Sequence, residues 1–184
     1  MCIRDRHFSF NDLIHKGALT GIRVEGPTNS VDQRIKRLSK ELDLLENEYS
    51  VLNVEQSNIF WKKTKNLEVF SNTEKNLLRV VVPVSETLNF LQKLKNVDLS
   101  YFLDWGGSLI WLELNDISIK ILNEIKDITK DHNGYFTIIK VEEDMKASAD
   151  IFTIDPIKYK ISEKIKKSFD PKRIFNPGKM YTGI

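Results

Sequence analysis

The chain has few of the residues that build disulfides and metal sites. Its 184 residues include one cysteine, Cys2, and three histidines, His7, His15 and His132. A single cysteine excludes an internal disulfide and suits a reducing compartment. Because the histidines form no i, i+4 pair and no CxxC motif accompanies them, we predict that the chain binds no metal.

Long apolar runs and a surplus of one charge are missing as well. No stretch reaches the length of about 18 apolar residues that a membrane span needs, and the N-terminus has no apolar signal-peptide core. We therefore expect a cytoplasmic protein without a direct membrane span. The 28 Lys and Arg nearly balance the 26 Asp and Glu, for a net charge of +2, so we expect no nucleic-acid partner.

The sequence contains no P-loop, no GxGxxG and no nucleophile elbow, so it lacks the usual nucleotide and hydrolase motifs. Its length suits one domain of ordinary size. The opening residues 1–6 present Arg4, Asp5 and Arg6 before any periodic pattern, which is typical of a non-native assembly scar. We assign residues 7–184 to the domain itself.

Hydrophobic periodicity and turn residues predict the elements along the chain. Three end signals stand out: Ser30 with Gln33 as a capping box, and Ser85 and Asp116 as helix caps. The predicted elements, in order, are a strand at 21–26, a helix at 30–48, a weak strand at 48–54, a short helix at 55–67, a strand at 76–84, a helix bearing Leu88, Leu91 and Leu94, a hairpin of strands 97–105 and 107–114, a helix bearing Ile121, Ile125 and Ile128, and a strand at 135–141.

From residue 76 onward the order is βαββαβ, which predicts an α+β fold of the ferredoxin-like type. This fold has an antiparallel sheet with helices on one face. The strand at 76–84 has apolar residues on both sides and is expected to be covered on both. Gly106 and Gly107 are expected to supply positive φ in the hairpin turn, with Trp105 packed on the core.

A last helix and an ordered tail complete the predicted fold. Asp155 is expected to cap this helix, with Pro156 at its first position and Asp170-Pro171 at its end. Apolar residues recur at every fourth position and predict that the helix docks by one stripe, formed by Ile157, Ile161, Ile165 and Phe169.

Arg79 interrupts the apolar strand "LLRVVVP", where a guanidinium needs an anionic partner. It either forms an internal ion pair or lies at a strand edge, or it meets a substrate carboxylate or an anion at a flavin site. In the tail, Asn176 stands before Pro177 and is expected to be extended, with its amide pointing outward. Gly178 then allows close approach to another surface, so the tail is either a locked turn or a ligand contact.

The tail "FDPKRIFNPGKMY" resembles the C-terminal signature of FAD-linked oxidases with the vanillyl-alcohol-oxidase type of flavin domain. Four further stretches, all upstream of the tail, also resemble this family and come in the same order as in it: "IRVEGPTNSVDQRIKRL", "FWKKTKNLEVF", "LLRVVVP" and "LDWGGSLIWLEL". The resemblance covers about residues 20–184.

The resemblance implies that the chain is a C-terminal cap over the flavin ring. FAD would be bound mainly by an N-terminal domain that these residues do not include, with Asn176, Pro177 and Gly178 contacting the cofactor and Arg79 the substrate. The implied activity is oxidation of a small 2-hydroxy acid, glycolate to glyoxylate, with no catalytic residue assigned. The implied partners are a second flavoprotein subunit and an iron-sulfur subunit of a glycolate oxidase complex, through which the protein would be peripheral to the inner membrane. The chain alone would be inactive.

Two alternatives stay open. One is a non-enzymatic binding or interaction module, because the ferredoxin-like order hosts many functions. The other is a different FAD-linked oxidase, such as a D-lactate dehydrogenase or a sugar-lactone oxidase. Related caps carry metal-ligating His motifs that are missing here, so whether this protein itself performs hydride transfer also stays open.

Overall fold

The computed structural model describes residues 3–4, 20–43, 49–70, 75–142, 145, 151–153, 155–178 and 181. It divides the chain into two compact units, Met1–Ser71 and Asn72–Ile184. Each unit is described by itself.

The described residues of the first unit form two helices and one short pair of strands. Helix α2 spans Thr28–Glu41 and α3 spans Val54–Lys65, while β1 (Ile3–Arg4) pairs antiparallel with β2 (Ser50–Val51). Both helices and the weak strand were predicted. The predicted end of the first helix, residues 44–48, lies outside the described residues.

Two predictions for this unit were wrong. Residues 21–26 form no strand, because no other described strand pairs with them. The N-cap of α2 is Pro27, which has no side-chain capping bond, so Ser30 lies inside the first turn instead of starting it. A capping box does occur at α3, where Asn53 accepts from the Gln56 amide at 2.9 Å and Gln56 accepts from the Asn53 amide at 3.1 Å.

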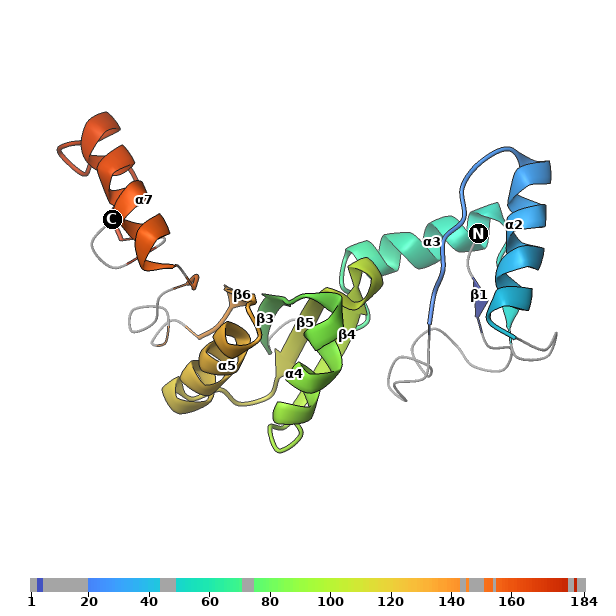
Figure 1. The fold of residues 1–184 in the computed structure, drawn as a ribbon, viewed down its shortest axis with the longest axis horizontal. Coiled ribbons are helices and arrows are strands. Elements are labelled where there is room, and N and C mark those ends of the chain that lie inside the picture. Colours follow the sequence, from blue (N-terminus) through green and yellow to red (C-terminus); the bar gives the residue numbers. More distant parts are fainter. Residues whose placement is uncertain are drawn as a thin grey trace. The chain divides into compact units, whose positions relative to one another are not determined.

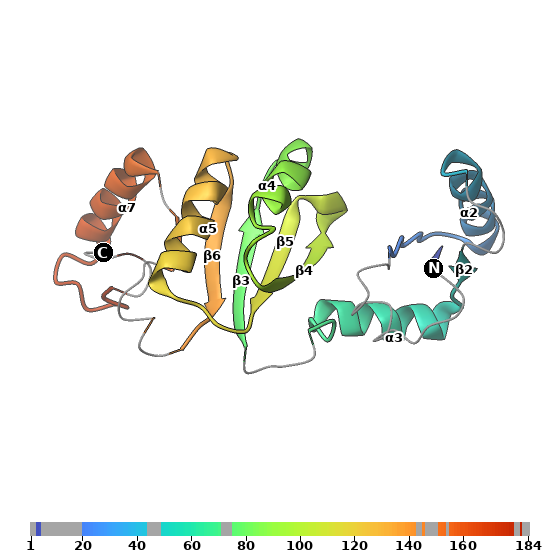
Figure 2. The same cartoon turned by 90° about the horizontal axis from the view of Figure 1, so that it is seen from below.

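The second unit has a four-stranded antiparallel sheet in the order β4-β5-β3-β6. Its strands are β3 (Asn76–Val81), β4 (Leu99–Asp104), β5 (Leu109–Leu114) and β6 (Tyr135–Lys140). The first and third strands of the βαββαβ series are central, which is the ferredoxin-like order. Helices α4 (Thr87–Lys93) and α5 (Ile119–Asp131) lie side by side over one face of this sheet (Figures 1 and 2). The predicted fold class is confirmed.

The hydrophobic core lies between this sheet and the two helices. Its fully buried side chains include Leu78 and Val80 of β3, Phe90 of α4, Leu122 of α5 and Phe136 of β6. Strand β3 alternates between these buried positions and half-buried ones. The prediction that β3 is covered on both sides is confirmed only for the Leu78 side, where α4 and α5 pack, since the β3 positions of the other side are half-buried.

The opposite side of the sheet is called the Arg79 face below. Register places the following residues on it: Leu77, Arg79 and Val81 of β3, Leu109, Trp111 and Glu113 of β5, Phe102 of β4, and Tyr135 and Thr137 of β6.

Two of the three predicted helix caps in this unit were wrong. Ser85 lies within the 3-10 turn η1 (Val84–Glu86), and α4 begins after it without a side-chain cap. Leu88 is consequently 72% exposed, while Phe90 enters the core. Helix α5 begins at Ile119 and is capped by Ser118, whose Oγ accepts from the Ile121 amide at 3.2 Å, so Asp116 lies too far upstream to cap it.

The hairpin turn has positive φ at both of its glycines as predicted, and α5 ends just before Asn133 and Gly134. Gly106 and Gly107 have φ of 65° and 100° in the turn η2 (Trp105–Gly107) between β4 and β5. Asn133 has φ of 54° after α5, and a Cβ at Gly134 would lie 2.7 Å from Val82 Cγ1. A side chain there would disrupt the packing of the turn against β3.

Helix α7 spans Pro156–Phe169 and has the predicted cap, since Asp155 accepts from the Ile157 amide at 2.8 Å. The predicted docking of its apolar stripe was wrong for the described chain. No residue of α7 is buried, and Phe169 is 85% exposed. The stripe has the helical spacing of a docking surface, but no described element of this unit covers it.

Candidate functional site

Arg79 lies at the centre of the sheet, opposite Trp111 on β5 and Thr137 on β6. Its guanidinium carbon is 5.3 Å from the ring centre of Trp105 and 6.0 Å from that of Trp111. Both distances fit cation–π contacts. Because β3 is a central strand, the strand-edge interpretation of Arg79 was wrong.

The ion-pair interpretation of Arg79 finds no partner among the described residues and stays a prediction. Within the described part of the chain no carboxylate pairs with Arg79. Two acids of the sheet lie on the same face. Glu113 lies opposite Leu77 and pairs with Lys75 at 3.3 Å, and Asp104, opposite Leu109, accepts from the Trp105 amide. The Arg79 guanidinium therefore contacts two indole rings among the described residues. Its planar set of N–H donors suits a carboxylate.

Trp105 belongs to this site and not to the core, which corrects the prediction for that residue. It is 62% exposed and has a φ of 52° at the start of the hairpin turn. Asp104 accepts a hydrogen bond from the Trp105 amide at 2.7 Å and holds the turn in this form. The backbone of η2 thus brings the indole over the guanidinium.

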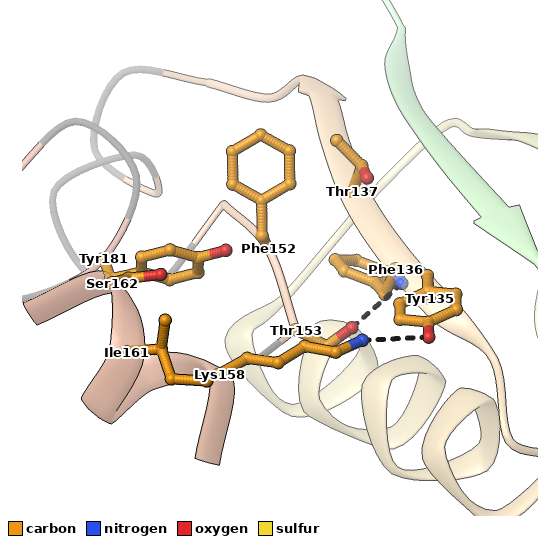
Figure 3. A pocket seen from close by; sticks show the side chains of 9 residues that line it. All are labelled: Tyr135, Phe136, Thr137, Phe152, Thr153, Lys158, Ile161, Ser162 and Tyr181. Atoms are coloured by element: carbon orange, nitrogen blue, oxygen red, sulfur yellow. Dashed lines mark hydrogen bonds between the residues drawn. The ribbon is translucent and has the colours of Figure 1, made fainter. Parts of the chain in front are cut away.

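A cavity of about 410 Å³ lies between β6 and α7 (Figure 3). Segment 151–153 closes one side by pairing with β6, where the Ile138 amide donates to Ile151 O at 2.9 Å and the Thr153 amide to Phe136 O at 3.2 Å. Thr137 both lines the cavity and pairs in register with Arg79. The cavity therefore begins one strand away from Arg79.

Lys158 is the cation of this cavity. Its Nζ donates to the Tyr135 hydroxyl at 3.0 Å, and this bond raises the pKa of the Lys158 ammonium above its ordinary value of 10.5. Sequence patterns did not reveal the cavity, because its walls come from β6, from 151–153 and from α7. The spacing of Tyr135 and Lys158 along the chain carries no signal that they meet.

Asp170 holds the tail in place beyond α7. Its carboxylate accepts from the amides of Ile174 and Phe175, both at 2.9 Å, and pairs with Lys166 at 2.8 Å. Lys166 also donates to the Phe175 carbonyl. These bonds, led by the one from Lys166, lower the pKa of Asp170 from 3.8 to about 2. The tail is thus a built turn, which favours the locked-turn interpretation of its backbone.

Within this turn Asn176 has φ of 46° and Gly178 has φ of 67°, so the predicted extended conformation of Asn176 was wrong. The chain turns here because the two amides that precede Asn176 donate hydrogen bonds to the Asp170 carboxylate. Residues 176–178 are exposed, and nothing lies within 4 Å of a Cβ added at Gly178. A flat group could therefore approach the backbone closely there.

These tail residues fit one contact to a flavin, not a site that encloses one. Neither the cavity of about 410 Å³ nor another of about 560 Å³ in the described part of the chain is lined by Asn176, Pro177 or Gly178. No described contact joins them to Arg79. The described residues also include no group of three or more His, Cys, Asp or Glu side chains placed to hold a metal ion. None of the described helices is long and apolar enough to cross a membrane.

The fold and these sites define the second unit as an α+β domain with a ferredoxin-like sheet, an architecture that serves many functions. The family described as FAD linked oxidases, C-terminal domain, matches residues 152–180. This segment, which includes α7, Asp170 and the Asn176–Gly178 turn, is therefore similar to part of that domain. The four other stretches that resemble flavin oxidases lie outside the match. No curated protein and no solved structure matches the chain.

Proposed function

We propose that this chain is the cap part of an FAD-dependent 2-hydroxy-acid oxidoreductase. The proposed substrate is glycolate, oxidised to glyoxylate, and the proposed likeness is to the FAD-binding component of bacterial glycolate oxidase. The observation that carries the proposal is the family match, which falls on α7 and the turn organised by Asp170.

The exposed apolar side chains around this turn support a docked position for it. Phe169, Ile174 and Phe175 are all mostly exposed, although the turn that carries them is held by charged hydrogen bonds. A contiguous apolar surface of this kind is typical of an interface. We infer that it packs on an N-terminal flavin-binding domain, which holds most of the FAD, and that Asn176, Pro177 and Gly178 then meet the flavin.

Arg79 is the proposed substrate-binding residue. A guanidinium binds a carboxylate through two parallel N–H bonds, and two indoles lie beside the Arg79 guanidinium. When bound, the flavin accepts a hydride from the substrate. The proposal includes an iron-sulfur subunit and a second flavoprotein subunit as partners for the onward electrons, with any membrane association made through them.

The test uses the complete protein, with its flavin-binding domain, and the variant Arg79→Met. We expect kcat/KM for glycolate to fall by roughly 10- to 100-fold, the usual effect of losing a charged hydrogen bond, while the visible flavin absorbance is unchanged. Arg37→Met is the control, because Arg37 lies exposed on α2 and pairs only with Glu41 among the described residues. Equal kcat/KM values for the two variants would show that Arg79 does not bind the substrate.

Parallel assays with D-lactate decide between glycolate and the substrates of related FAD-linked oxidases.

A second candidate function, a non-enzymatic binding module, is favoured by the ferredoxin-like strand order alone. A well-folded but colourless complete protein would favour that module over the oxidoreductase.

A further inference from the structure

The cavity between β6 and α7 has the size of a site for a small molecule. Its volume of about 410 Å³ lies in the lower part of the range for ligand pockets, roughly 300–1,000 Å³. The Asp170 turn, which the proposed flavin contact uses, does not line it. It is therefore a separate site in the same unit.

One positive charge faces this cavity, and no described lining residue carries a negative one. Among the described lining residues Lys158 is the one charged side chain, and no Asp or Glu accompanies it. The Tyr135 hydroxyl takes one of the three ammonium donors, which leaves two for a ligand. The nearby Asp155 carboxylate instead accepts from the backbone amides of Ile157 and Lys158, at 2.8 and 3.3 Å.

Aromatic rings make up much of the remaining wall. Figure 3 shows the rings of Tyr135, Phe152 and Tyr181 around the opening, with the Lys158 side chain running along one side. The ring centres of Phe152 and Tyr181 are 6.0 Å apart and the ring planes are tilted by 58°, within the range for aromatic contacts. The Thr153 hydroxyl accepts from the Phe136 amide at 3.0 Å and so keeps its own proton for a ligand oxygen.

We propose that this cavity binds a small aromatic carboxylate, with the carboxylate on the Lys158 ammonium and the ring among Tyr135, Phe152 and Tyr181. The uncompensated cation selects one negative group, and the hydroxyl of Thr153 offers a second donor to it. The three rings select a planar apolar body over a bare inorganic anion. The site lies beyond the proposed oxidoreductase function and does not depend on it.

Binding is tested on the 184-residue chain as it stands, by isothermal titration and by saturation-transfer NMR. Benzoate is the probe, benzyl alcohol has a ring without the charge, and inorganic phosphate has the charge without the ring. We expect benzoate to bind at least about tenfold more tightly than either of the others. No benzoate binding up to about 10 mM, or equal affinity for all three, would overturn the proposal.

Two lysine variants locate the bound probe. Lys158→Met is expected to weaken benzoate binding about tenfold or more, and Lys160→Met, on the same helix but outside the cavity lining, to leave it unchanged. Equal loss in both variants would mean general attraction to a basic helix and would refute the site. If Lys158→Met fails to fold, the affinities of the unsubstituted chain for benzoate, benzyl alcohol and phosphate still test the proposal. Because no flavin or turnover is measured, the result is independent of the Arg79 test.

Discussion

Asp170 shows how one side chain organises the end of this protein. It is 6% exposed, and its two oxygens accept bonds from two tail amides and from Lys166. Each of these bonds is stronger to the ionised carboxylate than to the neutral acid. The tail conformation therefore depends on the charge of this residue.

Replacing Asp170 with Asn should loosen the tail and leave α7 helical. The amide keeps one acceptor oxygen but loses the charge, so the Ile174 and Phe175 amides should exchange with solvent roughly tenfold faster. Hydrogen exchange followed by NMR measures this. Asp127→Asn, an exposed aspartate on α5, should change neither rate.

Acid should have the same effect as this substitution. The pKa of Asp170 is lowered from 3.8 to about 2 in the folded chain, so its contribution to stability is complete above the ordinary pKa. That contribution is lost as the pH falls from about 4 through about 2. The chemical shifts of the Ile174 and Phe175 amides should titrate with a midpoint near 2. A midpoint at the ordinary 3.8 would show that the three bonds are absent in solution.

Asn176 is the residue of the tail for which a flavin contact is proposed. In the complete protein, Asn176→Ala and Asn176→Gly should each raise the dissociation constant of FAD about tenfold, because both remove the side-chain amide. Glycine accepts the positive φ of this position at no cost. The Gly variant therefore removes the side-chain amide without straining the backbone, and it distinguishes the two effects. Flavin content retained in the Gly variant but lost in the Ala variant would make Asn176 a turn residue only.

At the scale of elements, the start of α5 is set by which polar residue reaches its first free amides. Asp116 and Ser118 are both good capping types, but Ser118 has the extended backbone and the bond to the Ile121 amide. Leu122 and Ile125 are the fully buried apolar residues of α5, whereas Ile121 and Ile128 only flank the core.

The two candidate caps predict different stabilities. Ser118→Ala should lower the free energy of unfolding by about 1 kcal/mol, and Asp116→Ala should change it by less than about 0.5 kcal/mol. Urea denaturation of the two variants measures the difference. The reverse ranking would show that α5 begins earlier in solution than in the structure.

At the scale of the whole molecule, the apolar stripe of α7 is the main surface left without cover among the described elements. Four side chains at helical spacing, Ile157, Ile161, Ile165 and Phe169, are all exposed in the described chain. Lysines occupy much of the rest of the helix, so the stripe is a narrow apolar band on a charged element. This arrangement suits docking on another protein surface.

The double variant Ile165→Lys and Phe169→Lys should therefore abolish docking on the proposed flavin-binding domain. Burying two unpaired ammonium groups at the interface should weaken binding by at least about 100-fold. Titration calorimetry with a separately expressed flavin-binding domain measures this, and circular dichroism checks that the helix persists. Lys167→Ala on the same helix is the control, and equal binding by all three chains would mean that the stripe faces solvent in the complex.

Local chemistry in the sequence was sufficient to predict most elements of the second unit. The β-branched run at 76–84, the two glycines of the hairpin and the Asp155-Pro156 start of α7 act within a few residues, so their effect does not depend on the rest of the fold. The order of these elements then allows few sheet topologies, and the ferredoxin-like one is observed. The start of α5 was predicted wrongly because two good capping residues, Asp116 and Ser118, lie within three positions of each other.

The sites depend on residues that only the tertiary structure brings together. Arg79 obtains its two indoles through the register of β3 with β5 and through the positive φ of Trp105. The Lys158 cavity requires β6, segment 151–153 and α7 to meet, although they are separated along the chain. Periodicity reports which side of a helix or strand is apolar, but cross-strand register and docking decide what lies opposite each side chain.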